Sequence, residues 1–89
     1  MRIAKVSAVW CPGCLVMWPI RKEIEKENPL LDTEYIDYDQ NKKFVEKHNI
    51  SDNLPVAIFF DEQDNELERV EWEVSKKYLL EIIEKYKDL

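Results

Sequence analysis

The sequence lacks the features that mark several large classes of protein. No apolar run approaches the roughly 18 residues that a membrane-crossing helix needs. The first residues have neither the apolar segment nor the small-residue cleavage site of a signal peptide, which favours a cytoplasmic protein. The 13 lysines and arginines are outnumbered by 19 aspartates and glutamates, giving a net charge of −6. This acidic balance makes nucleic acids and anionic membranes unsuitable partners.

Cysteine, histidine and glycine are also scarce. The chain has two cysteines, whereas a small secreted protein held together by disulfides would have more of them along its length. Its single histidine cannot complete the four ligands of a structural zinc site within one chain. We therefore predict no metal site. The only glycine, Gly13, suggests a turn that needs backbone freedom or the close approach of another molecule.

The residues that are present suit one small globular domain. Apolar residues make up 45% of the 89 residues, too many for a disordered chain, and we expect a single domain over residues 1–89. Apolar patterning predicts strands at residues 3–9, 33–38, 56–60 and 66–70, with helices at residues 14–28, from 41 and from 75. The order βαβαββα begins with a parallel βαβ unit and ends with an antiparallel hairpin before the last helix. It predicts an α/β fold with a four-stranded mixed sheet and helices on both faces.

The expected first helix is amphipathic and contains a proline, Pro19, that should kink it. The face predicted to pack in the core carries Leu15, Met17, Trp18 and Ile24. The face predicted to meet solvent carries Lys22, Glu25 and Lys26. In the second helix, His48 is expected to be exposed and without a role.

The segment Trp10-Cys11-Pro12-Gly13-Cys14 lies where the first strand ends and the first helix begins. Two cysteines at this spacing can close a small disulfide ring when they are oxidised. Cys11 lies just ahead of the helix, so free amide groups and the positive end of the helix dipole should stabilise its thiolate. The thiolate is the reactive form of cysteine, and the motif therefore predicts redox chemistry.

These residues, with Pro19 five residues after the second cysteine and Leu54-Pro55 ahead of a strand, make the chain resemble the thioredoxin family. The resemblance covers nearly the whole chain but not the extra amino-terminal strand and helix of full-length thioredoxins. It implies a monomeric thiol–disulfide oxidoreductase that reduces protein disulfides, needs no cofactor beyond its own cysteines, and is recharged by a reductase.

The resemblance also implies roles for individual residues. Cys11 would attack a substrate disulfide and Cys14 would resolve the mixed disulfide. Pro55 would be cis and lie against the cysteine pair, with Pro12 and Gly13 completing the motif. The backbone of Leu54 would pair with an extended substrate segment, and Trp10 and Trp72 would line the binding groove.

Three positions depart from the family pattern. The dipeptide between the cysteines is Pro-Gly rather than Gly-Pro, which leaves the reduction potential and the direction of electron flow open. Lys5 stands where the family keeps a buried acid; it is either a surface lysine or an ammonium that favours the thiolate. Glu71 replaces a loop glycine and Trp72 follows it, so we expect a narrower and more acidic groove.

Three other functions remain open. A glutaredoxin-like, glutathione-dependent reductase would share the fold, but the segment Val70-Glu71-Trp72-Glu73 has no glycine and two acids where such proteins hold glutathione. A metal-handling module could bind Cu(I) or zinc through the CxxC pair, or a metal through four cysteines of a dimer. Metallochaperones of that kind have the order βαββαβ, however, and end in a strand. An interaction module without turnover is disfavoured by the intact cysteine pair.

Overall fold

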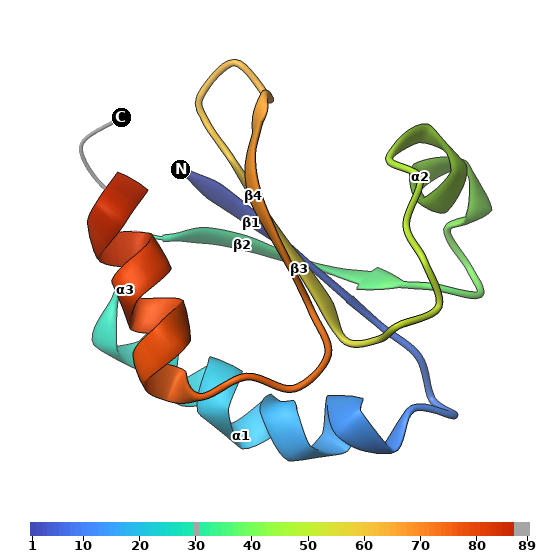
Figure 1. Ribbon diagram of the computed structural model, residues 1–89, viewed down its shortest axis with the longest axis horizontal. Helices are drawn as coiled ribbons and strands as arrows, with labels where there is room; N and C mark the ends of the chain where they lie inside the picture. The colour runs from blue at the N-terminus through green and yellow to red at the C-terminus, as the bar shows by residue number, and fades with distance from the viewer. Residues whose placement is uncertain (30, 87–89) are drawn as a thin grey trace.

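The computed structural model describes residues 1–29 and 31–86, which form a mixed sheet flanked by helices (Figure 1). The elements are β1 (Arg2–Ser7), α1 (Pro12–Glu27), β2 (Asp32–Asp37), α2 (Lys42–Lys47), β3 (Val56–Phe60), β4 (Glu66–Glu71) and α3 (Lys76–Tyr86). This order confirms the predicted βαβαββα arrangement, and the element bounds differ from the predicted ones by a few residues. Among the described residues, no helix is both long and apolar enough to cross a membrane.

The strand order in the sheet is β2-β1-β3-β4. Strand β1 pairs in parallel with β2 and antiparallel with β3, and β3 pairs antiparallel with β4. Because β1 and β3 run in opposite directions, the end of β1 lies beside the start of β3, where Val6 pairs with Val56. The loop that follows β1 and the loop that precedes β3 therefore meet at one end of the sheet.

Apolar cores lie on the two faces of the sheet. On one face, Ile3 and Phe59 pack with residues of α1 and α3. On the other face, Val6 and Ile58 pack near the partly buried Phe44 and Val45 of α2. All five residues of β3 are buried, as expected for a strand covered on both sides. The prediction of helices on both faces is thus confirmed.

The two edge strands of this sheet are acidic. Strand β2 carries Asp32, Glu34 and Asp37, while β4 carries Glu66, Glu68 and Glu71. Apart from Arg69, these strands have no basic residue among the positions that their bounds include. Six of the 19 acidic residues of the chain therefore lie on the two edge strands of the sheet.

The buried face of α1 differs from the predicted one. Met17 and Ile24 are buried as predicted, but Leu15 is 75% exposed and Trp18 is 52% exposed. Residues two apart on a helix point to different sides, so Leu15 cannot share the face of Met17. The third buried residue of α1 is Arg21, which completes the spacing i, i+4, i+7 with Met17 and Ile24.

The prediction that His48 is exposed is also wrong. Its ring lies 4.4 Å from that of Phe44 and 5.3 Å from that of Phe60, measured between centroids, and the residue is half-buried. Burial lowers the pKa of His48, since the charged imidazolium loses solvation there. We find no chemical role for it and regard it as packing.

Candidate active site

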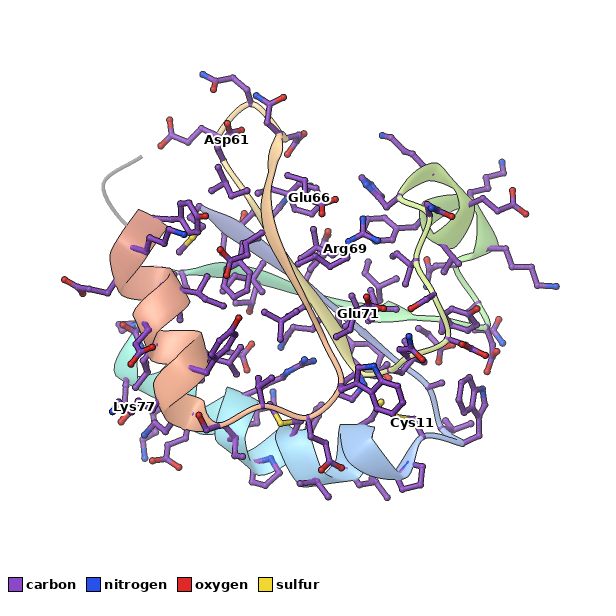
Figure 2. The ribbon with its side chains drawn as sticks, viewed as in Figure 1. Cys11, Asp61, Glu66, Arg69, Glu71 and Lys77 are labelled. Atoms are coloured by element: carbon purple, nitrogen blue, oxygen red, sulfur yellow. The ribbon has the colours of Figure 1, made fainter. Side chains whose placement is uncertain are left out.

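The two cysteines lie at the amino-terminal end of α1, where Figure 2 labels Cys11. Cys11 is the N-cap residue of α1, and its Sγ accepts a hydrogen bond from the backbone N–H of Cys14 over 3.2 Å. Cys11 is buried, Cys14 is half-buried, and both are free thiols. An amide donor therefore points at the Cys11 sulfur, as the position of the motif predicted.

The Leu54–Pro55 peptide bond is cis, which confirms the geometry that the family resemblance implies. Pro55 also lies against the cysteine motif, because its Cδ would be 3.3 Å from a Cβ added to Gly13. The same Cβ would lie 3.1 Å from Oε1 of Glu73. Gly13 does not have a positive φ, so close packing, rather than backbone freedom, favours glycine at this position.

A groove of about 500 Å³ opens beside the motif, and its lining residues are Trp10, Cys11, Pro12, Gly13, Leu54, Trp72 and Glu73. Trp10 and Trp72 are 51% and 62% exposed, so their rings are available at its rim. The structure thus brings the predicted groove residues together, with the buried Pro55 against Gly13 beneath them. Trp72 lies in the groove, as the family resemblance implied.

Backbone and side-chain contacts hold the two tryptophans in place. The indole N–H of Trp10 donates to Asp39 over 2.9 Å, and its ring meets Tyr38 edge-on at 6.0 Å between centroids. Trp72 has a φ of 72°, which is unusual for a residue other than glycine, and its N–H donates to the carbonyl of Asn53. Strained backbone of this kind persists where neighbouring structure holds it, often at binding sites.

The acid that lines the groove is Glu73 and not Glu71. The Glu71 carboxylate accepts a hydrogen bond from the hydroxyl of Ser51, whereas Glu73 lies beside Gly13. The expectation of an acidic groove therefore holds through Glu73. The hydrogen bond between Ser51 and Glu71 could not be foreseen from the sequence, because the two residues are twenty positions apart along the chain.

A small polar cavity lies on the other side of Cys14, toward the sheet. Its lining includes Lys5, Cys14, Arg21, Glu25 and Tyr35. Nζ of Lys5 pairs with Oε1 of Glu25 over 2.6 Å, and only 12% of the Lys5 side chain is exposed. Lys5 is therefore not a surface lysine, and the prediction that Glu25 faces solvent is wrong.

The Glu25 carboxylate is held by two elements of the sheet. Besides the ion pair with Lys5 of β1, its Oε1 accepts a hydrogen bond of 2.6 Å from the Thr33 hydroxyl of β2. Burial raises the pKa of Glu25, but the hydrogen bonds from Lys5 and Thr33 outweigh it, and the net direction is downward. Glu25 is thus held as a carboxylate that neutralises Lys5.

Arg21 is the charged residue of this cavity that the sequence analysis missed. It is 8% exposed, and its Nε and Nη2 are buried with no hydrogen-bond partner among the described residues. Because Arg21 is followed by other charged residues, the sequence suggested that it lies on the solvent-facing side of the helix. The signal that could have revealed it is its spacing from Met17 and Ile24, together with its position seven residues after Cys14.

Burial and amide donors have opposite effects on Cys11. Burial raises the pKa of the Cys11 thiol, and the hydrogen bond with the Cys14 side chain raises it further. Backbone donors at Cys14 and Gly13 lower it, as the helix position predicted, but the net direction is upward. The expected amide stabilisation is present and is outweighed by the loss of solvation.

This raised pKa predicts the pH dependence of Cys11 reactivity. The thiolate is the reacting form, so the alkylation rate by iodoacetamide should rise about tenfold per pH unit until the pH reaches the raised pKa. The rate at each cysteine can be followed by mass spectrometry of peptides, with N-acetylcysteine as the control. The Cys11 rate should still rise where the control has levelled off. A Cys11 plateau at a lower pH than that of the control would contradict the prediction.

Within residues 1–29 and 31–86, no group of three or more histidine, cysteine, aspartate or glutamate side chains is placed to hold a metal ion. The cysteine pair alone would supply two sulfur ligands, fewer than the four of a closed zinc site. The geometry of the site is thus that of two neighbouring thiols beside a groove lined by aromatic and aliphatic residues and by the carboxylate of Glu73.

Comparison with known proteins gives one consistent family. The sequence model of the family described as "Thioredoxin" matches residues 1–87. A thioredoxin of Chlamydia pneumoniae is 32% identical over 79 residues, which cover 89% of this chain and 76% of that protein.

Solved structures agree with this result. Thioredoxin 1 of Thermosipho africanus superposes with a TM-score of 0.85 at 25% identity, covering 99% of this chain and 96% of that one. A mutant thioredoxin of Halobacterium salinarum gives a TM-score of 0.87 at 22% identity, covering 99% and 75% of the two chains. The latter likeness concerns the fold alone.

Proposed function

Since this chain belongs to the thioredoxin family, whose fold and members support a thiol–disulfide oxidoreductase, we propose that it reduces disulfide bonds of protein substrates through a reversible Cys11–Cys14 disulfide. The observation that carries the proposal is the placement of the two free thiols at the start of α1, beside the groove and cis-Pro55.

The reaction needs only the two cysteines and a substrate disulfide. The Cys11 thiolate attacks one substrate sulfur, so a Cys11–substrate bond forms, the substrate S–S bond breaks, and the departing thiolate takes up a proton. The Cys14 thiolate then attacks Sγ of Cys11 and releases the second substrate thiol. Two electrons pass to the substrate, and the Cys11–Cys14 disulfide that remains must be reduced by a dithiol or flavin reductase.

The groove suits an extended polypeptide. Trp10 and Trp72 offer two exposed aromatic rings in the groove that Cys11 also lines, and aromatic side chains contribute strongly at binding interfaces. The backbone at Leu54, ahead of the cis bond, is the proposed partner for an extended substrate strand. The Glu73 carboxylate would favour segments without acidic residues close to the disulfide.

The glutaredoxin-like alternative ranks second. Glutathione carries two carboxylates, and the groove presents the acidic Glu73 near Cys11 and Gly13. We propose that protein disulfides are therefore preferred over glutathione mixed disulfides. We also propose a monomer with one domain over residues 1–89, acting in the cytoplasm, because disulfide reduction suits a reducing compartment.

The test compares two substrates. With dithiothreitol as the electron source, the protein should accelerate insulin reduction well beyond dithiothreitol alone, as measured by the turbidity of the precipitating B chain. With glutathione and a glutathionylated peptide, it should give little acceleration. Acceleration of the second reaction only would favour the glutaredoxin-like function, and acceleration of neither would overturn the proposal.

A further inference from the structure

Cys14 and Arg21 lie on one side of α1 and line the same cavity. They are seven residues apart, which is nearly two helical turns, so both project toward the sheet from the same stripe of the helix. Side chains on a helix tilt toward its amino terminus. The stem of Arg21 therefore extends from its own position toward the turn that carries Cys14.

Arg21 is a buried cation with no ion pair among the described residues, although the charge of Glu25, in the same cavity, acts on it. Its two buried nitrogens, Nε and Nη2, lack hydrogen-bond partners within the described chain. The neighbouring cation, Lys5, is already neutralised by Glu25. An arginine stays charged in proteins, and a buried charge without a partner is costly, so an anion that forms nearby would be stabilised.

The anion that redox chemistry can form in this cavity is a cysteine thiolate. Cys14 lines the cavity, whereas Cys11 lines the substrate groove. Burial lowers the pKa of Arg21, and the charges of Cys14, Cys11 and Glu25, in that order, act in the opposite direction. Other charged groups facing the cavity are Lys5, Lys22 and Glu25, with the Tyr35 hydroxyl beside them.

We propose that Arg21 is a positioning residue that compensates the Cys14 thiolate and thereby raises the reduction potential of the Cys11–Cys14 pair. This inference rests on the proposed redox function. The disulfide is uncharged and gains nothing from Arg21, whereas the reduced form can carry a thiolate beside it. Arg21 therefore stabilises only the reduced form.

The effect appears in the equilibrium with glutathione. Two glutathione molecules reduce the Cys11–Cys14 disulfide; the protein S–S bond breaks, its two sulfurs gain two electrons, and one glutathione disulfide forms. Of the two sulfurs released on the protein, the one beside a cation more readily remains a thiolate. Removing the cation should shift this equilibrium toward the protein disulfide.

Arg21→Met removes the charge and keeps a long, flexible side chain. We expect the equilibrium constant for reduction by glutathione to fall about tenfold, which corresponds to about 30 mV toward a more reducing protein. The thiolate absorbance at 240 nm should titrate at higher pH than in the unchanged protein. In Arg21→Lys, which keeps a positive charge, the equilibrium constant and the pH of thiolate titration should both stay close to those of the unchanged protein.

Lys26→Met is the matched control, because it removes one positive charge from an exposed position of the same helix. It should leave the equilibrium constant and the titration nearly unchanged. At 1 M salt the effect of Arg21→Met should persist, since a buried charge is poorly screened.

Unchanged potential and thiolate titration in Arg21→Met would overturn the inference and leave Arg21 a structural residue. If Arg21→Met does not fold, as judged by circular dichroism, the comparison of Arg21→Gln with Arg21→Lys decides in the same way. These readouts need glutathione and absorbance but no protein substrate. Failure to reduce insulin would therefore count against the proposed function alone, and an unchanged potential against the role of Arg21 alone.

Discussion

Replacing Cys11 by serine is expected to abolish disulfide reduction, with a loss of about a thousandfold or more in the rate of insulin reduction. A serine hydroxyl at this position cannot act as a thiolate nucleophile at neutral pH. Cys14 lines the inner cavity rather than the groove, so we do not expect it to substitute for Cys11. The substitution changes one atom at a buried N-cap, and serine is a favourable N-cap residue. The fold should therefore be retained, which circular dichroism would check.

Cys14→Ser is the matched variant and should behave differently. Cys11 can still attack a substrate, but no thiol resolves the mixed disulfide, so covalent complexes with protein substrates should accumulate on non-reducing gels. The same complexes should be absent with Cys11→Ser. The assignment of Cys11 as the attacking thiol would be wrong if the Cys11→Ser variant formed these complexes and Cys14→Ser did not.

Met17→Ala is expected to lower the free energy of unfolding by about 2–5 kcal/mol. Met17 is 1% exposed and packs in the core between α1, α3 and the sheet, so its removal leaves a cavity that the surrounding residues cannot fill completely. Small proteins have total stabilities of about 5–15 kcal/mol, so this loss is a large fraction. Urea denaturation of the oxidised protein would measure it.

Leu15→Ala on the same helix provides the control. Leu15 is 75% exposed, and alanine favours the helix, so the change should stay within about 0.5 kcal/mol. A sequence-based interpretation that placed both residues in the core would give them similar losses. Equal destabilisation by the two variants would show that the described burial of α1 is wrong.

The order of elements and the cysteine motif could be predicted because the evidence for them is local. Turn residues separate the apolar segments, and Trp10 to Cys14 form one continuous motif. The prediction that the Leu54–Pro55 bond is cis rested on the family resemblance, because nothing in the sequence by itself distinguishes a cis proline from a trans one. The groove residues could also be predicted to lie together, because the loop after β1 and the loop before β3 meet at one end of the sheet.

The inner cavity could not be predicted because it depends on contacts across the sheet. Arg21 and Glu25 look like solvent-exposed residues in a charged helix, and their burial becomes understandable only when Lys5 of β1 and Thr33 of β2 are placed beneath them. Trp18 was instead expected to be buried and is exposed. An aromatic residue beside a core methionine suggested burial, yet its ring lies on the surface, with Nζ of Lys22 4.7 Å from its centroid.

The acidic residues along β2 and β4 bear on how these chains behave toward one another. Strands at the edge of a sheet have free backbone groups that can pair with the edge of another molecule and so promote self-association. Two copies of this protein meeting edge to edge would bring acidic residues together. Some of these, such as Glu34 and Glu66, are paired with a cation of their own chain, and the remaining like charges would oppose such pairing. If the groove at the end of the sheet binds extended polypeptides as proposed, acidic edges would disfavour pairing with further copies of the chain and leave that groove free.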